Sequence, residues 1–140
     1  MKYLLPLLLL FVSCKGPEPI SDIPEIELIS VSPTSVKAFE DEIVFTVSYT
    51  DGDGDLGTND DTERNVFIKD ERLDVTHEFR LKQLAPADVA ITGIFDVTLP
   101  STILVDSSAT METVTFVLYV TDRAGNKSNE VMTDPIEVGR

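Results

Sequence analysis

Apolar and polar residues alternate along most of the chain that follows its first two dozen residues. Three runs show the alternation most clearly: residues 43–49, 95–99 and 114–120. In the first of them, Ile43, Phe45 and Val47 alternate with β-branched and hydroxyl side chains. Because successive side chains of a β-strand point to opposite faces, a period of two predicts strands with one buried face.

Four further runs bring the number of predicted strands to seven. The other four cover residues 24–31, 66–68, 78–82 and 131–138. The run over 24–31 carries two apolar sets of opposite parity, so we expect it to change faces or edges. Pro135 interrupts the last run and favours an edge strand, since proline cannot donate to the ladder. Residues 86–90 are the one helical candidate, for a single turn.

Seven short strands predict an all-β fold. A single sheet would leave one of its apolar faces in water, so two sheets must pack together. Roughly 115 residues with this strand spacing are typical of an immunoglobulin-like or fibronectin-type β-sandwich. We therefore expect one domain, a seven-stranded immunoglobulin-like β-sandwich, over residues 24–140.

The N-terminus has a different character. Residues 4–12 are apolar apart from Pro6, and Lys2 is the only charge before residue 15. This length suits a signal peptide and is well short of the roughly 20 residues of a membrane-spanning helix. The run ends in Phe-Val-Ser-Cys at Cys14, the only cysteine. This ending resembles the lipobox of bacterial lipoproteins, and a plain secretory signal is the alternative.

The lipobox resemblance implies cleavage of residues 1–13 and lipidation of Cys14. Several acyl chains on one cysteine would anchor the protein stably to a membrane without a helix. Residues 14–23 contain glycine and two prolines, which predicts an extended tether. Lys15 follows the cysteine where an aspartate would retain a Gram-negative lipoprotein at the inner membrane. By this resemblance we expect the protein to be anchored in the cell envelope, at the outer membrane. The resemblance does not assign it to the periplasmic or the surface-facing leaflet.

The net charge limits the classes of partner that the protein can bind. The chain has 11 basic and 25 acidic residues, and loss of Lys2 with the signal peptide leaves 10 against 25, a net charge of −15. Such a chain is repelled by nucleic acid and by anionic lipid surfaces. We therefore exclude nucleic acid as a partner, and we expect an envelope protein or an extracellular ligand.

Two further stretches resemble known proteins. Residues 120–129, Val-Thr-Asp-Arg-Ala-Gly-Asn-Lys-Ser-Asn, resemble the F–G hairpin of bacterial immunoglobulin-like domains. In that hairpin Gly125 would supply a positive φ, and Asp122 and Asn126 would bond to local backbone. Residues 49–57, together with the lipobox, resemble small lipoproteins of Bacteroidetes-type bacteria. The resemblance implies fold and location more than activity.

The acidic loop that follows the second predicted strand is the main candidate site. Its candidate ligands are Asp51, Asp53, Asp55, Asp60 and Asp61, with Asp122 and Asn126 from the F–G hairpin. Alternate aspartates separated by glycines can wrap oxygens around one centre, and Ca²⁺ takes six to eight oxygens in such loops. The spacing is not that of an EF-hand. We expect a structural Ca²⁺ site; a solvated turn without metal is the alternative.

The sequence gives little sign of catalysis. It contains no G-x-S-x-G, H-E-x-x-H or glycine-rich phosphate motif, and His77 is its only histidine. The charged run over residues 69–74 is expected to be a solvated turn. We predict that the protein is not an enzyme but a binding or adhesion-type module with a calcium loop. The alternative is a structural accessory subunit of an envelope complex, with an enzyme as a distant third.

Overall fold

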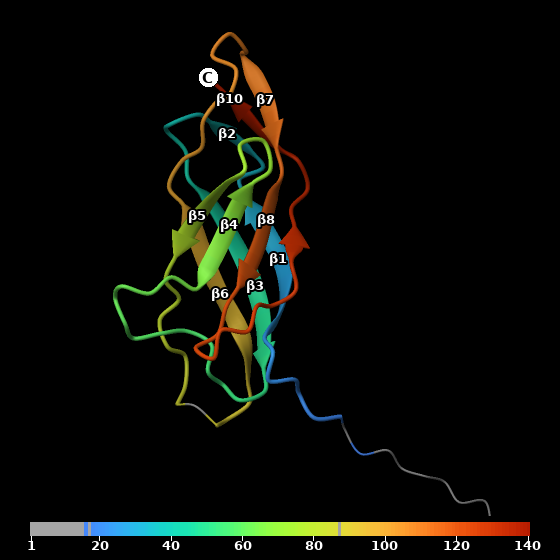
Figure 1. Ribbon diagram of the computed structural model, residues 1–140. Coiled ribbons are helices and arrows are strands. Elements are labelled where there is room, and N and C mark those ends of the chain that lie inside the picture. Colours follow the sequence, from blue (N-terminus) through green and yellow to red (C-terminus); the bar gives the residue numbers. More distant parts are fainter. Residues whose placement is uncertain (1–15, 17, 87) are drawn as a thin grey trace, which may run out of the picture.

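The protein is all-β, as predicted, in a computed structural model that describes residues 16, 18–86 and 88–140 (Figure 1). Cys14 and the predicted signal peptide lie outside these residues. Within them there are ten strand segments and no helix, so residues 86 and 88–90 do not form the helical turn expected there. The strands are β1 (Glu25–Ser32), β2 (Ser35–Lys37), β3 (Ile43–Asp51), β4 (Val66–Asp70), β5 (Val75–Phe79), β6 (Ile91–Leu99), β7 (Met111–Val114), β8 (Phe116–Val120), β9 (Val131–Met132) and β10 (Ile136–Gly139).

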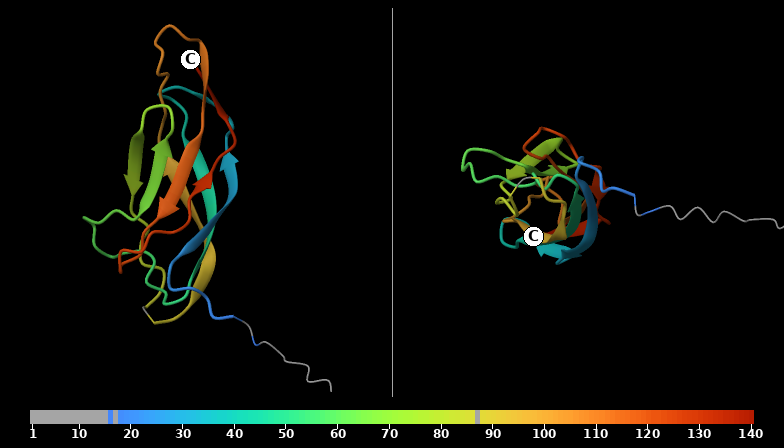
Figure 2. Two further views of the ribbon diagram at one scale, coloured as in Figure 1. Left: turned by 45° about the vertical axis from the view of Figure 1, so that its right-hand side comes forward. Right: turned by 90° about the horizontal axis from the view of Figure 1, so that it is seen from below.

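The strands form three sheets. Strand order is β1-β3-β6 in one sheet, β5-β4-β8-β9 in a second and β2-β10-β7 in a third. The first two sheets lie face to face (Figures 1 and 2). All pairings are antiparallel except that of β2 with β10, which is parallel.

The predicted inward positions form the core between the sheets. Along β3 every second residue from Ile43 to Asp51 is buried, and Phe95, Val97 and Leu99 of β6 are buried opposite them. Phe45 and Phe116 meet edge to face across the core, with ring centroids 5.6 Å apart. The predicted face change in the first strand is a β-bulge between Leu28 and Ser30.

Two further expectations about the fold were wrong. The last predicted run is two strands: β9 is an edge, but β10 is the central strand of its sheet. Pro135 lies in the break between them, where the chain passes from one sheet to the other. The run over residues 69–74 is not wholly solvated, because Asp70 is 1 % exposed and its carboxylate binds the Arg72 guanidinium at 2.7 Å. Arg72 also binds Glu112 at 3.0 Å, so a partly buried charge network centred on Asp70 closes this end of the molecule.

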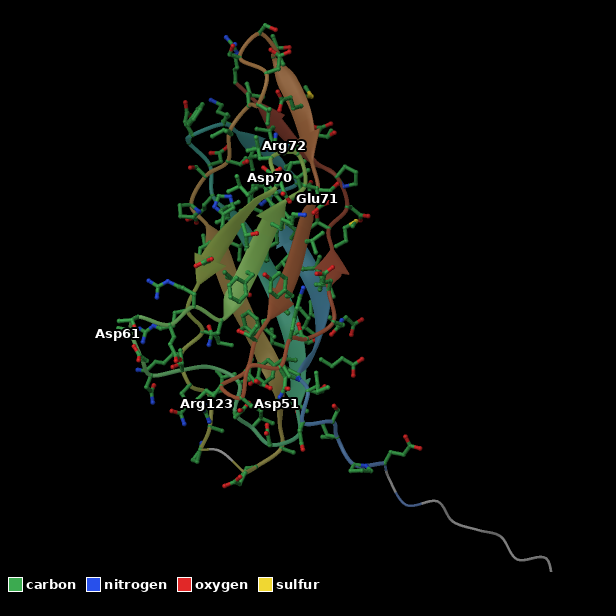
Figure 3. The ribbon with its side chains drawn as sticks, viewed as in Figure 1. Asp51, Asp61, Asp70, Glu71, Arg72 and Arg123 are labelled. Atoms are coloured by element: carbon green, nitrogen blue, oxygen red, sulfur yellow. The ribbon has the colours of Figure 1, made fainter. Side chains whose placement is uncertain are left out.

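The two ends of the sandwich differ. The described N-terminal segment leaves from the end where β3 finishes, and the C-terminus lies at the opposite end, near β7 and β10 (Figures 1 and 2). The acidic loop after β3 and the β8–β9 connection are therefore close to the N-terminal segment, and the Arg72 network is remote from it (Figure 3).

Candidate metal centre

Three aspartates at the end of β3 form a cluster. Asp51 is the last residue of the strand, and Asp53 and Asp55 follow it at alternate positions. One carboxylate oxygen of each residue lies within 4.8 Å of the others. Gly54 has a φ of +69°, which lets the chain curl after Asp53 instead of continuing the strand. The curl brings the carboxylates of alternate residues to a common centre.

Hydrogen bonds hold two of the carboxylates in place. Asp51 Oδ2 accepts the Leu56 N–H at 2.8 Å, and Asp55 Oδ2 accepts the Ala124 N–H at 3.0 Å. The Oδ1 atoms of Asp51, Asp53 and Asp55 are buried and accept no hydrogen bond from any described residue. Asp51 is fully buried and Asp55 is 8 % exposed. Buried polar atoms are rarely left without partners, so these oxygens are available to a ligand that the chain does not itself supply.

The electrostatics of the cluster agree with this interpretation. Burial raises the pKa of Asp51, and the charges of Asp53, Asp55 and Asp122 raise it further against the Leu56 N–H. Burial likewise raises the pKa of Asp55, and the charges of Asp122 and Asp53 raise it further. The Ala124 N–H and Arg123 lower it in part. A bare, fully ionised cluster is therefore unfavourable, and a cation or a proton would relieve it.

The β8–β9 connection brings Asp122 beside the three aspartates. Asp122 is 7 % exposed. Its carboxylate accepts two hydrogen bonds from Asn126, one from the backbone N–H at 2.7 Å and one from Nδ2 at 2.8 Å. Gly125 has the predicted positive φ, +89°. Asn126 thus orients Asp122 through its backbone N–H and its side-chain amide. Asp122 adds negative charge next to Asp55, which the pKa shift of Asp55 reflects.

Asp60 and Asp61 do not join the cluster. Thr58 bonds to the backbone of Leu81, and the chain beyond it loops outward, so that both aspartates are exposed (Figure 3). Asp60 accepts hydrogen bonds from Thr62. Asp61 forms an ion pair with Arg80. Of the seven candidate ligands, the structure gathers Asp51, Asp53 and Asp55, with Asp122 and Asn126 adjacent.

Sequence reasoning missed the backbone that surrounds the cluster. The Gly52 N–H donates to the Ser21 carbonyl at 2.7 Å, and the Asp88 N–H donates to the Asp53 carbonyl at 2.6 Å. A Cβ at Gly52 would lie 2.5 Å from the Ile20 carbonyl oxygen, and one at Gly54 would lie 2.0 Å from the Val89 carbonyl oxygen. The glycines of the D-G-D-G-D run were the available signal, since glycine often marks close backbone approach.

Comparison with known proteins adds little to the geometry. No protein-family model matches the chain, and no curated protein matches it. A protein solved by X-ray diffraction, Northeast Structural Genomics Consortium target SoR45, is similar to it with 14 % identity, a TM-score of 0.34 and 87 % of each chain covered. In the part of the chain that the structure describes, no helix is long and apolar enough to cross a membrane.

Proposed function

We propose that this protein is a lipid-anchored, non-catalytic binding module of the bacterial cell envelope, stiffened by a structural Ca²⁺ at Asp51, Asp53 and Asp55. The observation that carries the calcium site is the set of three buried Oδ1 atoms without hydrogen-bond partners among the described residues. Carboxylate oxygens alone form this set, which suits a hard cation rather than a thiolate- or imidazole-binding metal.

The spacing of the oxygens suits calcium. Ca²⁺ binds oxygen at about 2.3–2.6 Å, so two oxygens on opposite sides of one ion are separated by about 5 Å. The triad oxygens lie within 4.8 Å of one another, inside that limit. Three carboxylates leave further coordination positions for water or for Asp122, whose charge already acts on the cluster. Since Asp51 and Asp55 are buried, the ion would serve the fold rather than a substrate.

An immunoglobulin-like topology is part of the proposal. Strand order β1-β3-β6 facing β5-β4-β8-β9 is the order of an ABE sheet facing a C′CFG sheet. The parallel pairing of β2 with β10 fits a first strand that is divided between the two sheets. In this topology the β3–β4 and β8–β9 loops share one end of the sandwich, so calcium would stiffen both loops together.

The envelope location rests on the N-terminal sequence. If Cys14 is the lipidated residue, Cys14→Ser should abolish acyl labelling and processing by the lipoprotein signal peptidase. Persistent labelling of that variant would remove the anchor from the proposal.

The calcium site is tested by melting the mature chain, residues 14–140 with Cys14→Ser, in excess EDTA and in Ca²⁺. At about 100 times its Kd, Ca²⁺ adds about 2.7 kcal/mol to the free energy of unfolding, which raises Tm on the order of 10 °C. Asp53→Asn should lose this rise. Asp61→Asn, an exposed aspartate of the same loop, should retain it. An equal Tm in EDTA and Ca²⁺ for the unmodified sequence would reject the site.

A further inference from the structure

The N-terminal segment of the described chain lies directly against the acidic loop. Glu25, at the start of β1, pairs with Thr50. Before it, the chain bends at Asp22 and Ile23, so that Ser21 lies against the loop. There the Ser21 carbonyl accepts the Gly52 N–H at 2.7 Å. The segment thus extends the β1–β3 contact by one hydrogen bond, made by the glycine that separates Asp51 from Asp53.

Position 52 requires glycine because of this close contact, and not because of its backbone dihedral angles. Its φ is not in the positive range, unlike those of Gly54, Gly57 and Gly125. A Cβ at Gly52 would lie 2.5 Å from the Ile20 carbonyl oxygen and 2.7 Å from the Ser21 carbonyl oxygen. Backbone at such distances cannot move aside as a flexible side chain can. Only glycine therefore lets the N-terminal segment rest on the loop.

The position of Gly52 makes its contact sensitive to the charge state of the triad. The residues on either side of it supply two of the three buried Oδ1 atoms without partners among the described residues. Repulsion between the carboxylates of Asp51 and Asp53 also acts on the backbone that joins them. The docking segment also carries an acidic residue, Asp22, next to Ser21. A cation at the triad would hold the loop closed and lower the repulsion toward the segment.

We infer that the metal loop is a latch for the chain's own N-terminal segment: metal at the triad docks residues 20–24 on Gly52, and loss of metal releases them. This inference rests on the metal site proposed above and deepens it. With the segment released, ten residues separate a lipidated Cys14 from β1 and reach roughly 33 Å; with Ile20 docked, five residues remain and reach roughly 17 Å. Calcium would then set how closely the sandwich is held to its anchor.

The test is amide hydrogen exchange of the mature chain in EDTA and in Ca²⁺ at about 100 times the Kd measured by calorimetry. If release of the segment requires loss of the ion, Ca²⁺ should slow exchange of the Gly52 N–H by about 100-fold. The Ala38 N–H, bonded to the Gly139 carbonyl at the opposite end, reports on changes that are not local. Slowing at Gly52 well beyond that at Ala38 supports the latch.

A spin label at Glu18→Cys gives a second measurement on the same protein. The spectrum should show that Ca²⁺ immobilises the label when the loop is unmodified. In Gly52→Ala, which keeps all three carboxylates, the label should stay mobile in Ca²⁺. Gly16→Ala, where a Cβ meets nothing within 4 Å, is the matched control and should behave as the parent. Calcium binding with no change in Gly52 exchange or label mobility would overturn the latch and leave the metal site intact. Absence of calcium binding by calorimetry would overturn both.

Discussion

Replacing Asp51 with asparagine should make the metal-free protein more stable than the parent. In the presence of calcium, the same variant should be less stable than the parent. The side chain is fully buried, and its Oδ2 accepts the Leu56 N–H at 2.8 Å. In Asp51→Asn the amide oxygen can keep this hydrogen bond. The amide nitrogen then takes the Oδ1 position and can donate to Asp53 and Asp55, whose Oδ1 atoms are buried without partners among the described residues.

The structure sets the size of the effect. Unit charges separated by 4.8 Å, the limit within which the triad oxygens lie, repel by about 3.5 kcal/mol at an effective dielectric constant near 20. The substitution removes two of the three repulsive pairs, and relaxation of the loop in the parent reduces the gain. We expect the metal-free variant to be more stable than the parent by about 2–3 kcal/mol, a rise in Tm on the order of 10 °C.

Calcium should invert this order. With Ca²⁺ at about 1,000 times its Kd, the parent gains about 4.1 kcal/mol that the variant lacks. The assay is urea unfolding followed by far-ultraviolet circular dichroism, in EDTA and in Ca²⁺. The control is Asp41→Asn, an aspartate that accepts the Lys37 N–H at 2.8 Å outside the cluster and should give the same difference in both buffers. A variant less stable than the parent in EDTA would refute the repulsion argument.

Three further outcomes are expected. In the metal-free chain, the raised pKa values of Asp51 and Asp55 mean that the folded state binds protons that the unfolded chain has released. The stabilisation that these two carboxyl groups contribute in EDTA should therefore be fully present below the ordinary aspartate pKa and be lost as pH rises through their folded pKa values. Protons should weaken Ca²⁺ binding in calorimetry over the same range. Gly54→Ala adds a Cβ at a φ of +69° and 2.0 Å from a carbonyl oxygen. It should therefore lower the free energy of unfolding, measured in urea, by more than about 1 kcal/mol in EDTA and in Ca²⁺ alike. Arg72→Met leaves the buried Asp70 carboxylate without its ion pair and should cost about 3–5 kcal/mol in urea unfolding, independent of calcium; a loss under 1 kcal/mol would contradict a buried charge network.

The sequence by itself determined the class of the fold and the core positions. Side-chain alternation is a local property of extended chain, so the buried faces of β3 and β6 follow from a period of two. The D-G-D-G-D run likewise identified Asp51, Asp53 and Asp55, because residues so close in sequence remain close in any compact loop. The resemblance to a lipobox is also a local sequence pattern, and the lipidation of Cys14 that it implies stays a prediction.

Only the tertiary structure decided how distant segments meet. Alternation cannot say which strand pairs with which, so it missed that β10 is a central strand after the break at Pro135. It could not exclude Asp61 from the cluster, because the direction of its loop depends on the bond of Thr58 to Leu81. The docking of Ser21 on Gly52 is also a contact between segments far apart in sequence. Strand pairing and long-range hydrogen-bond partners depend on the packed chain, whereas residue periodicity depends only on the backbone of one strand.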